Sequence, residues 1–340
     1  MNKVKGKATD TPYEKSRLVI QAYNDRGKEE ILTQSPTIQR VSQRVIIALA
    51  PSLARQGINL FSRDITQAYV QSTTNLNRQI LAKIPKELHN EFPKGTIMIV
   101  RKPLYGIPEA GTHWWATYNQ HHKEKIGMET STYDPCLLIS GPNKPFGLVG
   151  MQTDDTLILG SQEFRAQEDR ELKKAHFLAK LVDCLSKETP LIFNGCILRQ
   201  EKDSIMLVQK GQGSKILPID AKSDNRTSQY REQRARGAYV ATICQPEAIF
   251  DLSVAAQHQD PSDEDVKALN KRLEWQIQNV DRGIRYISID LERTKLFVFV
   301  DGSFANNKDL SSQIGFVIIL ATEEESREEN SFKIQGNLVH

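Results

Sequence analysis

The sequence predicts an α+β fold, in which hairpins of antiparallel strands are combined with amphipathic helices. Residues 147–160 are apolar on both sides of an Asp-Asp pair, which indicates two short strands joined by a tight turn. Residues 191–198 and 205–208 predict a second hairpin. Residues 162–185 are charged but carry apolar side chains at helical spacing, which predicts a helix with one buried face.

The other elements follow in order along the 340 residues, a length sufficient for two or more domains with cores. A helix is predicted at residues 41–53, where Pro51 breaks or kinks it. Further helices are predicted at residues 111–126 and 264–281, and residues 68–79 fit either a helix or a loop. Apolar runs predict strands at residues 17–23, near Ile38, and at 59–64, 80–84, 97–100, 297–300 and 314–320.

The composition is that of an ordinary globular protein, with 39% hydrophobic and 26% charged residues. A net charge of +3 is mildly basic and by itself neither indicates nor excludes a nucleic-acid partner. The four cysteines form no C-x-x-C pattern and lie in apolar contexts, which favours free buried thiols in a reducing compartment. No apolar stretch approaches the length of a membrane helix, and the polar N-terminus does not resemble a signal peptide.

The Asp154-Asp155 pair carries the first indication of chemistry. Two like charges held side by side at the end of buried strands repel each other, and desolvation strengthens the repulsion. A divalent cation with oxygen ligands, typically Mg²⁺, compensates such a pair. A solvated surface turn between two strands is the alternative, because aspartates are common in turns.

Asp64 makes the metal interpretation stronger. It ends a short apolar strand 90 positions before Asp154 (154 − 64), and a small residue and an aromatic one, Ala68 and Tyr69, follow it four and five positions later. Carboxylates at the ends of two neighbouring strands can hold two metal ions about 3.5–4 Å apart. This is the layout of a polymerase palm.

Motifs spread along nearly the whole chain now point to a family. They are, in chain order, residues 15–19, 34–40, 63–69, 102–107 with Trp114-Trp115, 134–139, 152–155, 236–247 and 300–305. In this order they resemble the motifs of the reverse transcriptase of copia-type long-terminal-repeat retrotransposons, in a form similar to fungal elements. No single motif is specific, but their order is.

The resemblance implies a right-hand polymerase with fingers, palm and a small thumb at residues 1–215. A connection would follow at 216–290, and a partial ribonuclease H-like sheet at 291–340. It also implies RNA-directed DNA synthesis with two Mg²⁺ ions held by Asp64, Asp154 and Asp155. The implied partners are an RNA or DNA template with its primer, and dNTPs; no membrane partner is expected.

The same resemblance implies a polyprotein fragment that acts inside the cell, in the cytoplasm and within a virus-like particle. It further implies nucleotide contacts. Tyr69 would lie beneath the incoming sugar and exclude a 2′-hydroxyl, although packing in the core also fits this residue. The other implied contacts are triphosphate binding by Lys15, Arg17 and Arg40, phosphate binding by the N–H groups of Ile65 and Thr66, and close backbone approach at Gly106. Which of the three cations reaches the phosphates is left open.

Two departures from the family pattern bear on activity. Glu109 stands where many relatives have Gln, and a carboxylate near a nucleotide needs a donor partner. Gln152-Thr153 replaces Tyr-Val ahead of the aspartates, so the ring that stacks on the primer is lost. A catalytically inactive, nucleic-acid-binding remnant of a retroelement is therefore the alternative function.

Asp301 resembles the first metal ligand of ribonuclease H, and a nuclease of that type is a second alternative. An aspartate without a catalytic role at a strand end fits equally well. We expect no hydrolysis of an RNA–DNA hybrid, because Glu323–Glu325 indicates a solvated turn rather than a metal cluster. An uncovered apolar sheet face would favour self-association; its expected members are Phe297, Phe299, Phe316 and Ile318.

Overall fold

The computed structural model describes residues 3–5, 13–15, 17–31, 33, 35–305, 310–324 and 331–340. Its centre is a six-stranded antiparallel sheet in the order β10-β3-β9-β8-β7-β6. These strands are β10 (Asp183–Cys184), β3 (Asn59–Asp64), β9 (Asp155–Gly160), β8 (Gly147–Gln152), β7 (Leu137–Ser140) and β6 (Met128–Thr130). The prediction of a mixed helix-and-sheet fold is confirmed.

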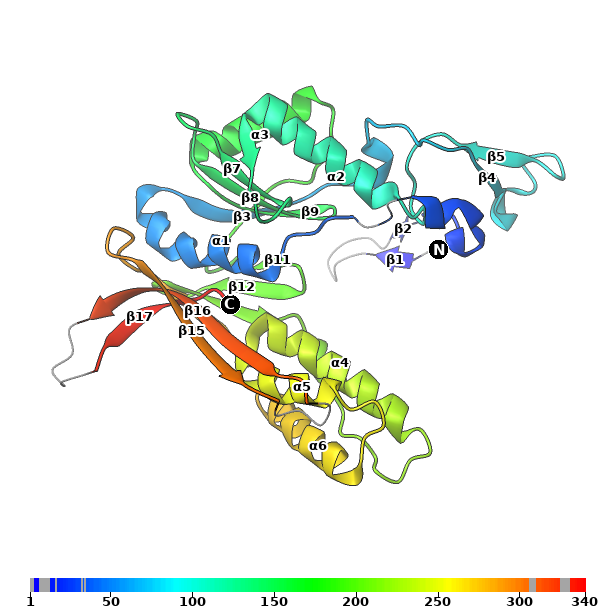
Figure 1. Ribbon diagram of the computed structural model, residues 1–340. Coiled ribbons are helices and arrows are strands. Elements are labelled where there is room, and N and C mark those ends of the chain that lie inside the picture. Colours follow the sequence, from blue (N-terminus) through cyan, green and yellow to red (C-terminus); the bar gives the residue numbers. More distant parts are fainter. Residues whose placement is uncertain are drawn as a thin grey trace.

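Helices cover both faces of this sheet (Figure 1). One face packs on α1 (Arg40–Leu53), and the other packs on α2 (Ala110–His121) and α3 (Gln162–Lys174). Two glycines of β8 show why the helices lie so close. A Cβ at Gly150 would come within 2.4 Å of Ile38 and 2.9 Å of Ile46, and a Cβ at Gly147 within 2.4 Å of Phe164.

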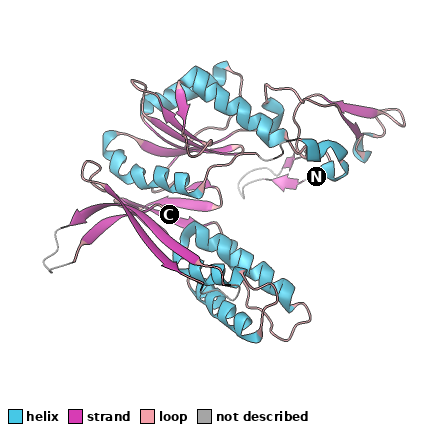
Figure 2. Ribbon diagram, viewed as in Figure 1, coloured by secondary structure: helices cyan, strands magenta, loops and turns pink. Residues whose placement is uncertain are grey.

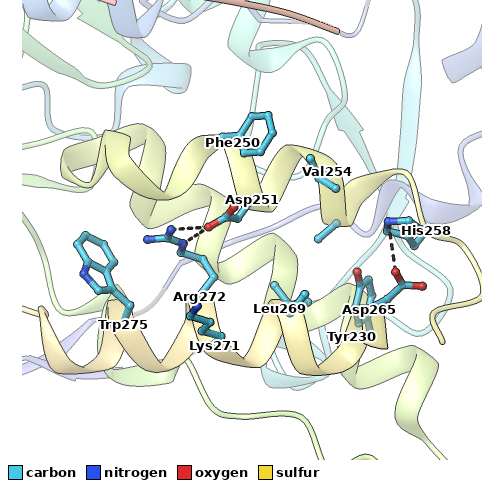
Figure 3. Close-up of a pocket in the computed structure, with 12 residues that line it drawn as sticks. Tyr230, Phe250, Asp251, Val254, His258, Asp265, Leu269, Lys271, Arg272 and Trp275 are labelled. Carbon is cyan, nitrogen blue, oxygen red and sulfur yellow. Dashed lines mark hydrogen bonds and ion pairs between the residues drawn. The ribbon is translucent and has the colours of Figure 1, made fainter. Parts of the chain in front are cut away.

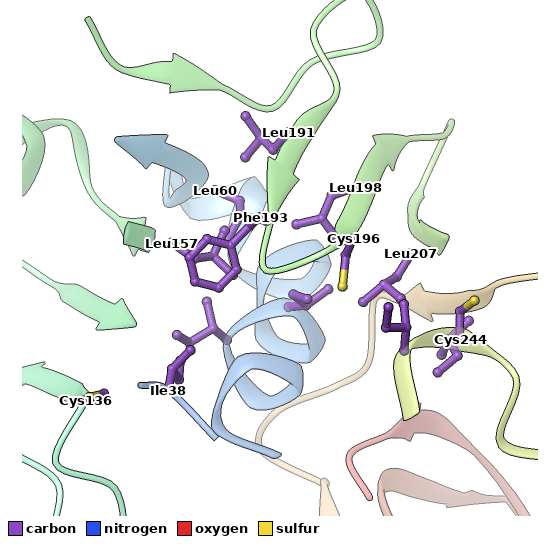
Figure 4. Close-up of a cluster of buried hydrophobic side chains, with 14 of the residues drawn as sticks. Ile38, Leu60, Cys136, Leu157, Leu191, Phe193, Cys196, Leu198, Leu207 and Cys244 are labelled. Atoms are coloured by element: carbon purple, nitrogen blue, oxygen red, sulfur yellow. The ribbon is translucent and has the colours of Figure 1, made fainter. Parts of the chain in front are cut away.

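A second sheet lies on the far side of α1. It has the order β11-β12-β13-β14 and pairs strands that are distant in sequence. Its strands are β11 (Leu191–Phe193), β12 (Cys196–Gln200), β13 (Ser204–Gln209) and β14 (Ile284–Ile287). One core joins the two sheets: Figure 4 shows Leu60 and Leu157 of the first sheet beside Phe193 of β11.

The remaining elements extend from this centre (Figure 2). A helical bundle is formed by α4 (Arg226–Cys244), α5 (Ile249–Ala256) and α6 (Asp263–Gln278). A three-stranded sheet contains β15 (Lys295–Ser303), β16 (Gln313–Glu324) and β17 (Lys333–Leu338). Two strand pairs lie towards the N-terminal side: β1 (Lys3–Lys5) with β2 (Tyr13–Lys15), and β4 (Ile80–Lys83) with β5 (Ile97–Val100). Within the described residues, no helix has the length and apolar character that crossing a membrane requires.

Several predicted boundaries are wrong. The helix predicted at 162–185 ends at Lys174, where His176 adopts a positive φ of 58° and the chain turns towards β3. The strand predicted at 191–198 is two strands, because Asn194-Gly195 forms a tight turn with both φ angles positive. Residues 17–23 and the run near Ile38 contain no strand.

The C-terminal sheet differs from the prediction in two ways. Glu323 and Glu324 lie within β16 and pair with Lys295 and Lys333, so they are not part of a loop; Glu325 lies outside the described residues. The expected apolar face is also wrong. Val300 lies opposite Phe316, and Phe299 opposite Val317, so Phe299 and Phe316 project from opposite faces. Both of these phenylalanines are exposed.

Candidate active site

The turn between β8 and β9 brings three aspartates to one end of the six-stranded sheet. Thr153 and Asp154 form the turn, and Thr153 has a positive φ of 54°. Asp155 begins β9 and lies directly opposite Asp64, the last residue of β3. Residues that are directly opposite in an antiparallel pair share a face of the sheet. The backbone N–H of Ile65 also donates to the Asp154 carbonyl at 2.8 Å, which ties the turn to the end of β3.

The three carboxylates repel one another in a half-buried setting. Burial, followed by the charges of Asp154 and Asp64, raises the pKa of Asp155 to about 6. Burial and the Asp64 charge also raise the pKa of Asp154 above its ordinary value. The negative charges of Asp154 and Asp155 therefore cost free energy here, and a nearby positive charge would lower that cost.

One cation reaches the aspartates from a segment that sequence reasoning missed. The Lys180 ammonium lies 2.5 Å from a carboxylate oxygen of Asp64. The single helix predicted at residues 162–185 does not place Lys180 at the end of the sheet. No pattern in the sequence identifies this lysine, because its position depends on a pairing between segments more than 100 residues apart.

Arg17 and two tyrosines lie beside Asp154. The Arg17 guanidinium stacks 4.3 Å from the ring centre of Tyr105, and the rings of Tyr105 and Tyr69 are 4.8 Å apart. Burial raises the pKa of both tyrosines, and the charge of Asp154 raises each further. Arg17 and Tyr69 are both predicted nucleotide contacts, and the structure brings them together near the aspartates.

Other predicted nucleotide contacts are used within the protein. Arg40 Nη1 donates to Gln43 at 3.0 Å and to the Asn194 carbonyl at 3.3 Å, in the turn between β11 and β12. The N–H groups of Ile65 and Thr66 donate to backbone carbonyls at 2.8 Å, so neither N–H is available to a phosphate in this structure. The side chain of Lys15 lies outside the described residues.

Gly106 permits a close approach between two backbone segments. Its φ is +88°, and a Cβ there would lie 2.0 Å from the carbonyl oxygen of Ile20. The Ile20 N–H donates to the Tyr105 carbonyl at 2.8 Å. The glycine therefore holds the segment of Arg17 against Tyr105, which differs from the expected direct contact with a nucleotide.

Glu109 has the donor partner that its position requires. Arg78 donates to Glu109 at 2.7 Å and also pairs with Asp25 at 2.5 Å. The two carboxylates lie in separate segments, and Arg78 joins them. The departure from Gln at this position is thus compensated locally.

On the opposite face of the sheet, Arg63 forms a buried charge network. Its guanidinium donates to Glu168 of α3 at 2.8 Å, and His122 lies 3.8 Å from the same carboxylate. Burial raises the pKa of Glu168, but the interactions of its carboxylate with His122 and with the Arg63 guanidinium outweigh this effect, so the net pKa is lowered. This network ties α3 to the strand that ends at Asp64.

Asp301 is separate from these groups. It lies on β15 opposite Gly315 and is exposed to solvent.

A cavity of about 470 Å³ lies among α4, α5 and α6 (Figure 3). Two interactions link side chains on its wall: Arg272 pairs with Asp251, and His258 lies 3.6 Å from Asp265. These pairs support the packing of the bundle. The cavity contains none of the three aspartates at the sheet end.

Residues 2–229 match the family model described as Reverse transcriptase (RNA-dependent DNA polymerase). The chain belongs to this family. It is also 25% identical, over 153 residues, to the Retrovirus-related Pol polyprotein from transposon TNT 1-94 of Nicotiana tabacum. That match covers 44% of this chain and 11% of the polyprotein, so the chain spans about a tenth of its relative. The resemblance to copia-type reverse transcriptases is thereby confirmed, and with it an enzyme family of the nucleotidyltransferase kind.

Proposed function

We propose that this chain carries out RNA-directed DNA synthesis at the end of the six-stranded sheet. The observation that carries the proposal is the direct pairing of Asp64 with Asp155, with Asp154 in the adjoining turn. In-line attack of a primer 3′ hydroxyl on the α-phosphate of a dNTP needs carboxylates from two neighbouring strands at this position.

By residue type, the three aspartates suit Mg²⁺. Three half-buried carboxylates supply hard oxygen ligands, and their mutual repulsion is the kind that a divalent cation relieves. When bound, two such ions supply activation of the 3′ hydroxyl and stabilisation of the leaving pyrophosphate. Among the described residues, no group of three or more His, Cys, Asp or Glu side chains is arranged to hold a metal ion. The Asp64 carboxylate is engaged by Lys180 instead.

Arg17 and Tyr69 are the chain's own candidates for handling the nucleotide. Arg17 carries a planar cation suited to phosphate oxygens, and its stacking on Tyr105 positions it on the Asp154 side of the site. The Tyr69 ring lies 4.8 Å from the Tyr105 ring, at a tilt of 42°, and would lie beneath the sugar of the incoming nucleotide. Arg40 is left out of this role because its donors bind the turn at Asn194.

The proposed site also fixes the assignment of the polymerase subdomains along the chain. We assign fingers, palm and small thumb to residues 1–215, the connection to 216–290, and a ribonuclease H-like sheet to 291–340. Template, primer and dNTPs are the proposed partners, and the exposed apolar side chains of β15 and β16 support self-association as well. The four free cysteines, three of them buried, support an intracellular location.

A primer-extension assay with Mg²⁺ on an RNA template tests the proposal. Extension by the native chain, lost in Asp154→Asn, is the expected result. Thr156→Ser is the matched control on the same hairpin, since it keeps the buried hydroxyl and adds no charge. Extension that persists in Asp154→Asn would show that the proposed site does not catalyse it.

Tyr69→Ala tests the sugar gate separately. Removal of the ring should raise ribonucleotide incorporation relative to deoxynucleotide by about tenfold or more, a change of about 1.4 kcal/mol in relative barrier height. Competition between the two nucleotides on one primer measures the ratio. Tyr23→Ala, at an exposed ring away from this cluster, should leave it unchanged.

A specific observation keeps the inactive remnant as the second candidate. Gln152 occupies the position of the missing ring, and its buried side-chain oxygen has no partner. The neighbouring Thr153 carbonyl is held by the Trp114 indole at 2.8 Å, so the turn is packed against α2. Binding of a primer–template duplex without extension by the native chain would favour this candidate.

A further inference from the structure

Resting on the proposed function, we propose that Lys180 is a built-in counter-cation of the carboxylate cluster. It stabilises the three aspartates when no divalent cation is bound, and it must leave Asp64 before Asp64 can bind one. The Asp64 carboxylate therefore binds either the Lys180 ammonium or a divalent cation from solution, but not both at once.

The backbone places Lys180 at the site by pairing. The Lys180 N–H donates to the Asp64 carbonyl at 2.9 Å, and the Thr66 N–H donates to the Leu178 carbonyl at 2.8 Å. Between them, Ile65 and Ala179 form an antiparallel bridge. Residues 178–180 therefore continue the sheet alongside the end of β3.

Two side chains also bind the backbone of residues 178–180. Gln71 accepts from the Leu178 N–H at 2.7 Å, and Arg63 donates to the Lys180 carbonyl at 3.3 Å. The backbone of Lys180 is thus fixed by contacts that do not involve its own ammonium. Loss of the ammonium should leave the segment in place.

The ammonium itself is free to move away. The Lys180 side chain is 63% exposed, and the Asp64 side chain is 38% exposed, so a path to solvent is open. A divalent cation bound to Asp64 would lie close to the Lys180 ammonium and repel it, because both carry positive charge.

Lys180→Met tests the first half of the inference in buffer with EDTA. The variant keeps the length of the side chain and removes its charge, so the melting temperature should fall by roughly 2–4 °C. Lys180→Arg keeps the charge and should restore the native value. Lys174→Met is the matched control, because Lys174 is also 63% exposed and pairs with a single carboxylate, Glu171. It should change the melting temperature by less than about 1 °C.

Titration calorimetry with Mn²⁺ tests the second half on the same proteins. Without its competitor, Lys180→Met should bind Mn²⁺ at least about fivefold more tightly than the native chain, and Lys174→Met should bind as the native chain does. Unchanged or weaker Mn²⁺ binding in Lys180→Met would overturn the exchange. An unchanged melting temperature in EDTA would overturn the counter-cation role.

The two measurements also separate this inference from the proposed function. If the native chain binds no Mn²⁺, the metal site of the proposed function fails and the exchange fails with it. The melting temperatures in EDTA still decide whether Lys180 compensates the carboxylates.

Discussion

Arg63 and Asp64 are consecutive residues of β3, yet the charge of Arg63 is buried with its partner and the charge of Asp64 is partly exposed. Arg63 faces α3, is 5% exposed, and donates to Glu168 at 2.8 Å. Asp64 faces the other side, where two more carboxylates crowd it and an exposed lysine is the cation that pairs with it. One face of the strand end thus holds a buried ion pair and is closed to solvent, and the other gathers three carboxylates and is open to solvent.

This comparison distinguishes two uses of charge. The Arg63–Glu168 pair stabilises the fold, whereas the aspartate cluster is available to bind a cation. A buried ion pair has fixed partners, and removal of one partner leaves the other stranded in a low dielectric. A half-buried cluster of like charges is unfavourable by itself and becomes favourable when a cation arrives. The rigid pair behind the strand keeps Asp64 in register while the open side exchanges partners.

Arg63→Met should break the closed side with the largest effect. It leaves the fully buried Glu168 without its guanidinium, so we expect a loss of about 3–5 kcal/mol in the free energy of unfolding, measured with urea. Arg170→Met is the control, since the Arg170 side chain is 59% exposed and pairs with Glu171 on the helix surface. It should cost about 0–1 kcal/mol. Equal losses in the two variants would contradict the division between the faces.

Gly106→Ala should act on the open side through backbone geometry rather than charge. A methyl group would meet the Ile20 carbonyl at 2.0 Å in a residue with a φ of +88°, so we expect a loss of about 2–4 kcal/mol in the same experiment. Gly57→Ala separates the two causes. Gly57 has a φ of +75° but no neighbour within 4 Å, so it should cost only about 1–2 kcal/mol.

Gly106→Ala should also loosen the segment of Arg17 from Tyr105. Amide hydrogen exchange of the Ile20 N–H, which donates to the Tyr105 carbonyl, measures this directly. Unchanged protection of that amide would show that the glycine is not what holds the two segments together.

The sequence predicted those parts of the fold that depend on local patterns. The hairpin around Asp154-Asp155, the strand that ends at Asp64 and the helix predicted at 41–53 follow from apolar runs and turn residues. The Asn194-Gly195 turn also has a local signal, because Asn-Gly between apolar runs is a strong hairpin indicator. The split of the apolar phenylalanines between two faces required the register of β15 and β16, which composition does not contain.

The candidate site was predictable in its carboxylates but less so in its cations. Asp64, Asp154 and Asp155 occur at strand ends and turns, where residue type and position agree. Lys180 and Arg63 were missed because each acquires its role from a partner about 100 residues or more away. Glu109 shows the same limit. Physical chemistry requires a hydrogen-bond donor for its carboxylate, but the sequence does not identify Arg78 as that donor.

The smallest expected effect is on the pH dependence of folding stability that results from protonation of Asp155. It tests whether the three carboxylates destabilise the fold by repelling one another. The pKa of Asp155 is raised from 3.8 in an ordinary setting to about 6 in the fold. Between these values the folded chain keeps a proton that the unfolded chain loses, so stability is present below about pH 4 and is lost as the pH rises through 6. The full shift corresponds to about 3 kcal/mol, and solvent screening reduces this to about 1–2 kcal/mol.

Asp155→Asn removes this titration, so without metal at pH 7.5 the variant should be more stable than the native chain by that amount. At pH 4 the two should differ little, and urea unfolding at several pH values measures the change. Asp183→Asn, at the exposed edge strand β10, controls for loss of one negative charge from the sheet. A difference between native chain and Asp155→Asn that stays constant from pH 4 to 7.5 would show that Asp155 stores no repulsion. In that case the open side would need no cation to hold its carboxylates together, and the contrast with Arg63 would reduce to exposure alone.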